Sequence, residues 1–200
     1  ILATPLKRGQ IILSYFVSAA FSSVILTGII LAVGLAIICM HGDIYLGAID
    51  ILKAFGVVAL GSISATSIFM IVVLFLKSVS ASGAFFGLLS AVSGFIIGAY
   101  IPISQFSDTV QTVCNIFPAS QITIILRNVL INGLLEHMNT TLDGVDQGMF
   151  VTSIKELFSF KARLFDSYFD MSQMLVYIVV SIMICIVVQI LVYSKTYKKA

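Results

Sequence analysis

Long stretches without a charged residue are the feature that most constrains this chain. Four of them, at 9–42, 54–76, 78–107 and 171–194, contain no Asp, Glu, Lys or Arg. An α-helix rises about 1.5 Å per residue, so about 20 apolar residues cross the roughly 30 Å hydrocarbon layer of a bilayer. Each stretch is long enough. The sequence therefore predicts an all-α integral membrane protein with four transmembrane helices.

A water-soluble globule is excluded by composition. Hydrophobic residues make up 60% of the 200 residues and charged residues only 10%, and the mean hydropathy is +1.13. This leaves too little ionisable surface to keep a globule of this size dissolved. The net charge of +2 is too small to indicate a nucleic-acid partner, whereas membrane lipid is an expected one.

The charges that flank the spans predict an orientation. We expect spans at 16–39, 54–76, 83–103 and 172–193, which puts both termini on one side. The bases on that side are Lys7, Arg8, Lys77, Lys195, Lys198 and Lys199, and no acid accompanies them; the other side has five bases and all nine acids. Bases close to span ends favour the cytoplasmic side. We therefore expect a multi-pass protein of the cell membrane, namely a bacterial plasma membrane. Both termini are expected in the cytoplasm.

The connection between the third and fourth spans contains a fifth uncharged block, 109–126, that is broken by Pro118. Ser120 is available to cap a new helix after the break, and each half is expected to be too short to cross the bilayer. Arg127 also argues against a full span, because an Arg near the bilayer centre costs about 2.5 to 3.5 kcal/mol. We therefore expect four regions: the spans within 1–107, a re-entrant hairpin at 108–136, a small outer insert at 137–170, and the last span with its tail at 171–200.

Motifs for catalysis are absent from the sequence. It has no phosphate-binding Gly-x-x-x-x-Gly-Lys-Ser/Thr stretch, no His-Glu-x-x-His and no Gly-x-Ser-x-Gly. Its two histidines, His41 and His137, fall in expected loops, and no acid lies within the four spans. Ion-coupled transport and intramembrane hydrolysis both need ionisable groups at depth, so we expect neither, and no metal or cofactor bound by this chain.

Small residues follow one face of the third span. Gly87, Ser90, Gly94 and Gly98 recur at intervals of three or four, and Gly94 and Gly98 form a GxxxG step. Such a stripe allows another helix backbone to approach closely. Two interpretations stay open here: ordinary helix packing, or a face on a dimer interface or a weakly polar substrate pathway.

The order of these features resembles the membrane subunits of type 2 ABC exporters. The resemblance lies in the opening segment Ile-Leu-Ala-Thr-Pro-Leu-Lys-Arg-Gly-Gln, the three spans that follow, Gly-Ala-Tyr-Ile-Pro-Ile from Gly98, Phe-Pro-Ala-Ser from Phe117 with the apolar run to Arg127, and a last span. It covers essentially the whole chain.

The resemblance implies that the four spans correspond to the third to sixth helices of a six-helix subunit, without the first two. It implies that Thr4, Pro5, Leu6, Lys7 and Arg8 form a cytoplasmic coupling helix that docks on the ATPase; from the residues alone, a basic membrane flank is the alternative. Pro118 and Arg127 would belong to an outer gate. The family works as a dimer with the third span near its axis, so the partners implied are an ABC ATPase subunit, which binds ATP and Mg²⁺, and a second permease subunit, identical or different.

The function expected is therefore that of a non-enzymatic permease subunit. It would export an amphiphilic substrate, such as a drug, a peptide or a lipid-like molecule, by alternating access. The alternative is a non-transporting membrane sensor or immunity protein whose outer insert binds a peptide.

Overall fold

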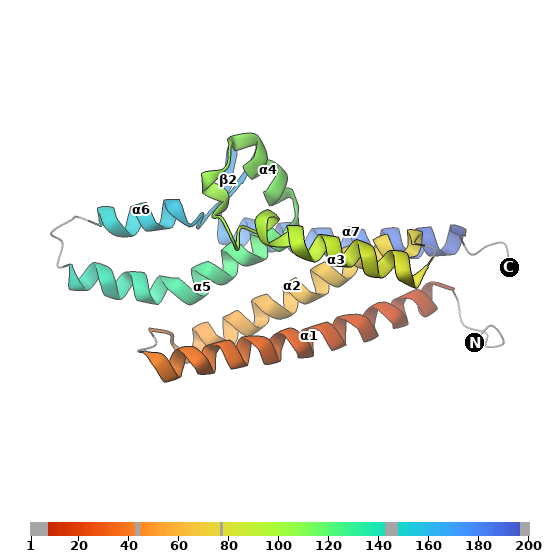
Figure 1. The fold of residues 1–200 in the computed structure, drawn as a ribbon, viewed down its shortest axis with the longest axis horizontal. Helices are drawn as coiled ribbons and strands as arrows, with labels where there is room; N and C mark the ends of the chain where they lie inside the picture. The colour runs from red at the N-terminus through yellow and green to blue at the C-terminus, as the bar shows by residue number, and fades with distance from the viewer. Residues whose placement is uncertain (1–7, 43–44, 77, 143–147, 197–200) are drawn as a thin grey trace.

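A computed structural model describes residues 8–42, 45–76, 78–142 and 148–196 (Figure 1). The residues Thr4 to Lys7 of the expected coupling helix lie outside the described residues. The elements in chain order are α1 (Arg8–His41), α2 (Ala48–Phe75), α3 (Val79–Ile96), the 3₁₀ turn η1 (Ile103–Gln105), α4 (Asp108–Ile116), α5 (Pro118–Thr141), α6 (Met149–Leu157), β1 (Ala162–Leu164), β2 (Ser167–Phe169) and α7 (Met171–Thr196).

Four of the described helices are long and apolar enough to cross a membrane: α1, α2, α3 and α7. This confirms the expected all-α membrane architecture, and a fifth span arises only if α4 and α5 are counted as one bent unit. The start of α1 and the end of α7 lie at the same end of the bundle, on the right in Figure 1. We call this the terminal end, and the opposite end, where α1 turns into α2, the distal end.

The third span is shorter than expected, because α3 ends at Ile96 rather than near 103. Gly98 has a φ of +70°, a left-handed conformation that suits glycine. The amide of Ala99 donates to the Gly94 carbonyl at 2.9 Å, and the amide of Gly98 donates to the Phe95 carbonyl at 3.2 Å. This pair of bonds is a Schellman motif. The expectation that Gly98 continues a helical GxxxG stripe is therefore wrong, since Gly98 terminates the helix.

Hydroxyl and amide side chains join the long helices. The hydroxyls of Thr27 on α1 and Ser62 on α2 lie 2.7 Å apart, and the Gln189 amide of α7 donates to the Ser67 carbonyl of α2 at 2.6 Å. Gln189 is 2% exposed. Such interhelical hydrogen bonds contribute about 0.6 kcal/mol each in a membrane. The small polar residues of these spans therefore serve helix packing.

The core lies where α5 and α7 pack against α2 and β1. Its buried members are Val57, Ile124, Ile125, Ala162, Met174, Ile178 and Ile182. Gly61 of α2 permits a close approach of α5, because a Cβ at this position would lie 2.8 Å from the Ile122 side chain. The core therefore fixes α5 and the insert strand on the bundle of long helices.

The helix α5 differs from the expected short half of a hairpin. It runs for 24 residues and meets α4 at 96°, so the pair forms a corner rather than two antiparallel arms. Beyond residue 136 it reaches the connection between α1 and α2, where the Tyr45 and His137 rings stack with centroids 4.1 Å apart. A Cβ on Gly133 would lie 2.0 Å from the Tyr45 carbonyl oxygen. At the distal end, α5 therefore packs against the connection between α1 and α2.

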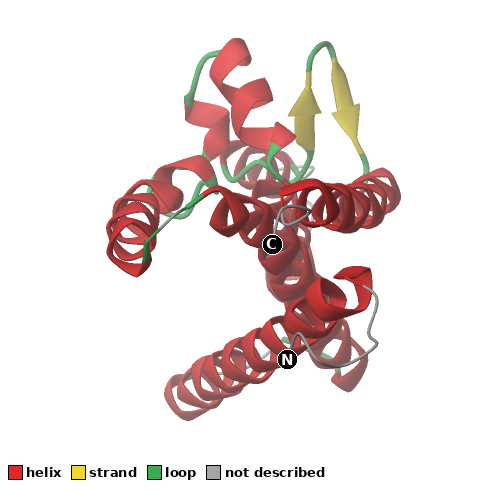
Figure 2. Cartoon of the chain, turned by 90° about the vertical axis from the view of Figure 1, so that its right-hand side faces the viewer, coloured by secondary structure: helices red, strands yellow, loops and turns green. Residues whose placement is uncertain are grey.

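The insert contains a β-hairpin that the sequence analysis did not anticipate. β1 and β2 pair antiparallel, with Ala162 opposite Phe169 and Leu164 opposite Ser167. Figure 2 shows the hairpin beside α4, to one side of the long helices. Ala162 and Leu164 are buried, at 0% and 5% exposure. The hairpin is therefore packed on the rest of the protein instead of forming a core of its own, as expected for so short a segment.

Candidate functional site

The corner between α4 and α5 brings several polar side chains together beside the apolar helices. A helix break leaves carbonyls of the last turn without partners within the helix, and lipid supplies no hydrogen bonds. In this corner, side chains of α5 and α7 donate hydrogen bonds to the last carbonyls of α4. Ser120 donates to the Cys114 carbonyl at 2.7 Å, Gln121 to the Asn115 carbonyl at 2.8 Å, and Tyr177 of α7 to the Ile116 carbonyl at 2.8 Å.

Pro118 begins α5 directly after Phe117, the single residue between the end of α4 at Ile116 and α5. Proline fits the first helical position because that position needs no amide donor. Ser120, predicted as the cap of this helix, does not cap it. Its hydroxyl also lies 2.8 Å from the Ile96 carbonyl, so it joins the corner to the end of α3.

Arg127 binds the insert to the end of α3. Its guanidinium donates to the Gly98 carbonyl at 3.2 Å and to the Phe158 carbonyl, and it lies 5.9 Å from the centroid of the Phe158 ring. The next residue, Asn128, donates from its side-chain amide to the Ile124 carbonyl, one turn earlier, at 2.8 Å and to the Phe160 carbonyl at 2.9 Å. Two neighbouring side chains of α5 therefore hold the backbone of the insert.

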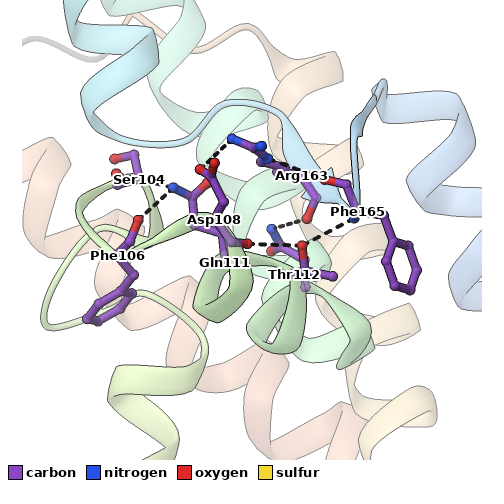
Figure 3. A network of polar contacts seen from close by, with 8 residues as sticks. Ser104, Phe106, Asp108, Gln111, Thr112, Arg163 and Phe165 are labelled. Carbon is purple, nitrogen blue, oxygen red and sulfur yellow. Dashed lines mark hydrogen bonds and ion pairs between the residues drawn. The ribbon is translucent and has the colours of Figure 1, made fainter.

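The face of α4 holds the β-hairpin through a second set of contacts (Figure 3). Arg163 and Asp108 form an ion pair at 2.5 Å. The amide of Asn115 donates to the Arg163 carbonyl at 3.0 Å, and the amide of Phe165 donates to the Thr112 hydroxyl at 3.2 Å. β1 and the first residue of the turn that follows it are thereby attached to α4.

The connection before α4 is attached to the same unit. Gln111 donates to the Phe106 carbonyl at 2.8 Å, as Figure 3 shows. The Ser104 amide donates to the Ser159 hydroxyl at 2.8 Å, and the Ser104 hydroxyl donates to the Leu157 carbonyl. We call the assembly of η1, α4, residues 118–128 of α5 and residues 157–165 the corner unit.

Two buried oxygens in the corner unit have no hydrogen-bond partner: Asn115 Oδ1 and Gln121 Oε1. The two residues are 1% and 0% exposed. A buried amide oxygen without a donor costs about 1 to 3 kcal/mol, so each can accept a hydrogen bond from a water or another donor. The chemistry available here is hydrogen-bond acceptance. No group of three or more metal-ligating side chains occurs among the described residues.

The predicted site residues fall in separate places. Pro118 and Arg127, which the sequence assigned to one gate, both lie in the corner unit. Arg127 also donates to the carbonyl of Gly98, a residue expected on the dimer or pathway face. Gly87 and Ser90 lie on the exposed face of α3, where a Cβ on Gly87 would meet nothing within 4 Å. Gly94 is buried within this chain, because its Cβ would lie 2.2 Å from the Tyr100 ring. Arg8 is the first residue of α1, and the rest of the predicted coupling segment lies outside the described residues.

Sequence reasoning did not select the residues that hold the corner together. These are Asp108, Asn115, Gln121, Asn128 and Arg163, while Ser120 was selected only as a helix cap. A signal for three of them was present, because Asn115, Gln121 and Asn128 are amides within or beside an otherwise apolar block. Amides at membrane depth need partners, and a helix break supplies unpaired carbonyls.

Comparison with known proteins adds no assignment to this geometry. No protein-family model matches the chain, no curated protein matches it, and no solved structure matches it.

Proposed function

We propose that the chain is the permease subunit of an ATP-driven export system of the type 2 ABC exporter kind. The observation that carries the proposal is the corner unit, which contains a broken helix pair between the third and the last long helix of the chain and is hydrogen-bonded at the break. This is the position in which the resemblance implies an outer gate. Pro118 and Arg127, the residues assigned to that gate from the sequence, both belong to the unit.

The corner unit has the properties that a gate of this kind requires. Side chains within the unit donate to carbonyls of α4. Polar contacts join the unit to the long helices at the Tyr177 hydroxyl and the Ile96 carbonyl, in addition to the apolar packing of α5 in the core. Because Ile124 and Ile125 of α5 are packed in the core with α2 and α7, a movement of this unit would be coupled to those long helices. In the proposed cycle it opens outward while the long helices tilt.

The exposed face of α3 is the proposed contact with a second permease subunit. This helix is not packed along any other helix in the described part of the chain; its Phe86 ring meets Phe69 of α2 edge to face, with centroids 5.5 Å apart. Gly83 and Gly87 face open space. An exposed helix side with small residues suits close packing against a copy.

ATP hydrolysis is proposed to act on the terminal end through residues 4–8. The chain would be paired with a separate ATPase that binds ATP and Mg²⁺. In the test, the chain is purified together with the ATPase encoded beside it, in nanodiscs, and hydrolysis is measured with and without the chain. The paired change Lys7→Glu and Arg8→Glu should uncouple or detach the ATPase. The matched control is Lys198→Glu with Lys199→Glu, which makes the same charge change in the tail.

Stimulated hydrolysis that is lost in the first pair and kept in the control supports the proposal. Equal behaviour of the two pairs would remove the coupling assignment. Absence of any ATPase association, together with binding of a peptide to the insert, would favour the sensor or immunity function.

A further inference from the structure

Two buried side-chain amides meet at the break between α4 and α5. Asn115 lies in the last turn of α4 and Gln121 in the first turn of α5, and they are 1% and 0% exposed. Gln121 Nε2 donates to the backbone carbonyl of Asn115 at 2.8 Å, so the two residues are in direct contact. Asn115 Nδ2 donates to the Arg163 carbonyl at 3.0 Å. These two bonds fix which atom of each amide is the oxygen. Both oxygens, Asn115 Oδ1 and Gln121 Oε1, have no hydrogen-bond partner in the described part of the chain.

The hydroxyls around the break do not supply the missing hydrogen bonds. Ser120 donates to the Cys114 carbonyl, and Tyr177 donates to the Ile116 carbonyl. The Thr112 hydroxyl donates to a carbonyl one turn earlier in its own helix. Each hydroxyl has a single hydrogen to donate. The two amide oxygens therefore need a donor from outside these side chains.

The type and number of the free atoms select a water molecule. Buried waters make about two to four hydrogen bonds to polar groups that would otherwise be unsatisfied, and one water can donate a hydrogen to each of two oxygens. A carboxylate or phosphate needs donors, whereas both free atoms are acceptors. A cation such as Ca²⁺ or Mg²⁺ takes about six or more oxygen ligands, and two amide oxygens are free here among the described residues.

We propose that a resident water molecule binds at the break and donates to both Asn115 Oδ1 and Gln121 Oε1. It joins the last turn of α4 to the first turn of α5, in addition to the direct bond from the Gln121 amide to the Asn115 carbonyl. The binding site goes beyond the transport proposal and does not rest on it.

The test measures contact with water at single side chains. The full chain, with isotope-labelled glutamine, is placed in lipid bilayers, and solid-state NMR follows the transfer of magnetisation from water protons to the side-chain amides. The Gln121 signal is identified by its loss in Gln121→Met. We expect transfer to Gln121 nearly as fast as to the exposed Gln173 and much faster than to Gln189, which is 2% exposed and donates to the Ser67 carbonyl. Equal transfer to Gln121 and Gln189 overturns the proposal.

Two variants show whether one water bridges the pair. Asn115→Leu removes one of the two acceptors, so transfer to Gln121 should be largely lost. Asn128→Leu is the matched control, because each change deletes one bond to an insert carbonyl, that of Arg163 or Phe160, and Asn128 contributes neither free oxygen. Transfer to Gln121 should persist in this control.

The remaining outcomes overturn the bridge. Unchanged transfer in Asn115→Leu shows that no water is shared by the two amides. Equal loss in both leucine variants assigns the effect to a loosened insert. A Gln121 signal that shifts with sodium concentration and receives no transfer from water identifies a cation as the occupant. None of these readouts depends on an ATPase, so failure here is distinct from failure of the transport proposal.

Discussion

Gly98→Ala tests how the third long helix ends and what the glycine there contributes. The residue has a φ of +70°, and the left-handed conformation costs an L-residue about 1 to 2 kcal/mol. The new Cβ would also lie 2.7 Å from Ile103 Cγ1, and Ile103 is 2% exposed. Overpacking of this kind costs about 1 to 3 kcal/mol. We therefore expect a total loss of about 2 to 5 kcal/mol in the free energy of unfolding.

Gly87→Ala is the matched control on the same helix. Its Cβ would meet nothing within 4 Å, and alanine is favoured over glycine in a helix interior by about 1 kcal/mol. The two substitutions add the same methyl group and should shift stability in opposite directions. The assay is reversible unfolding of the purified chain in mixed detergent micelles, followed by helical circular dichroism.

The outcome separates two accounts of the glycines. If both belonged to one open helical stripe, both alanine variants would be stabilised by similar amounts. A Gly98→Ala variant at least as stable as the parent would refute the Schellman termination and the packing of Ile103 beneath it.

Three further substitutions test other contacts. Gly133→Ala would place its Cβ 2.0 Å from the Tyr45 carbonyl oxygen; we expect a loss of about 1 to 3 kcal/mol in unfolding free energy and easier proteolysis of the distal end, whereas unchanged cleavage kinetics would contradict the close approach. Arg163→Gln removes an ion pair in which the Asp108 side chain is 67% exposed, so stability should fall by at most about 1 kcal/mol, and a larger loss in chemical unfolding would show that the pair is the main attachment of the hairpin. Gln189→Met deletes a buried hydrogen bond to α2 and should cost about 0.6 kcal/mol in the same assay, while a gain would show that the bond does not stabilise the packing of α7.

The membrane architecture could be predicted closely, while the connection between α3 and α7 could only be predicted in outline. The break at Pro118 was predicted, because proline cannot donate to the preceding turn. The direction of the chain after it was not, because the 96° corner depends on contacts of α5 with α2. Gly94 shows the same limit: its spacing from Gly98 matches a helix–helix motif, but the chain turns back and places Tyr100 over it.

The sequence by itself determined where four helices can cross a bilayer, because transfer of a segment into hydrocarbon depends on its own length and apolarity. It also determined that the charges of the terminal end are all basic. The tertiary structure alone decided which polar groups satisfy one another. Ser120 reaches a carbonyl 24 residues away, Tyr177 one 61 residues away and Gln189 one 122 residues away. Such pairs follow from how the helices pack, since a hydrogen bond depends on distances of about 3 Å that local sequence patterns do not contain.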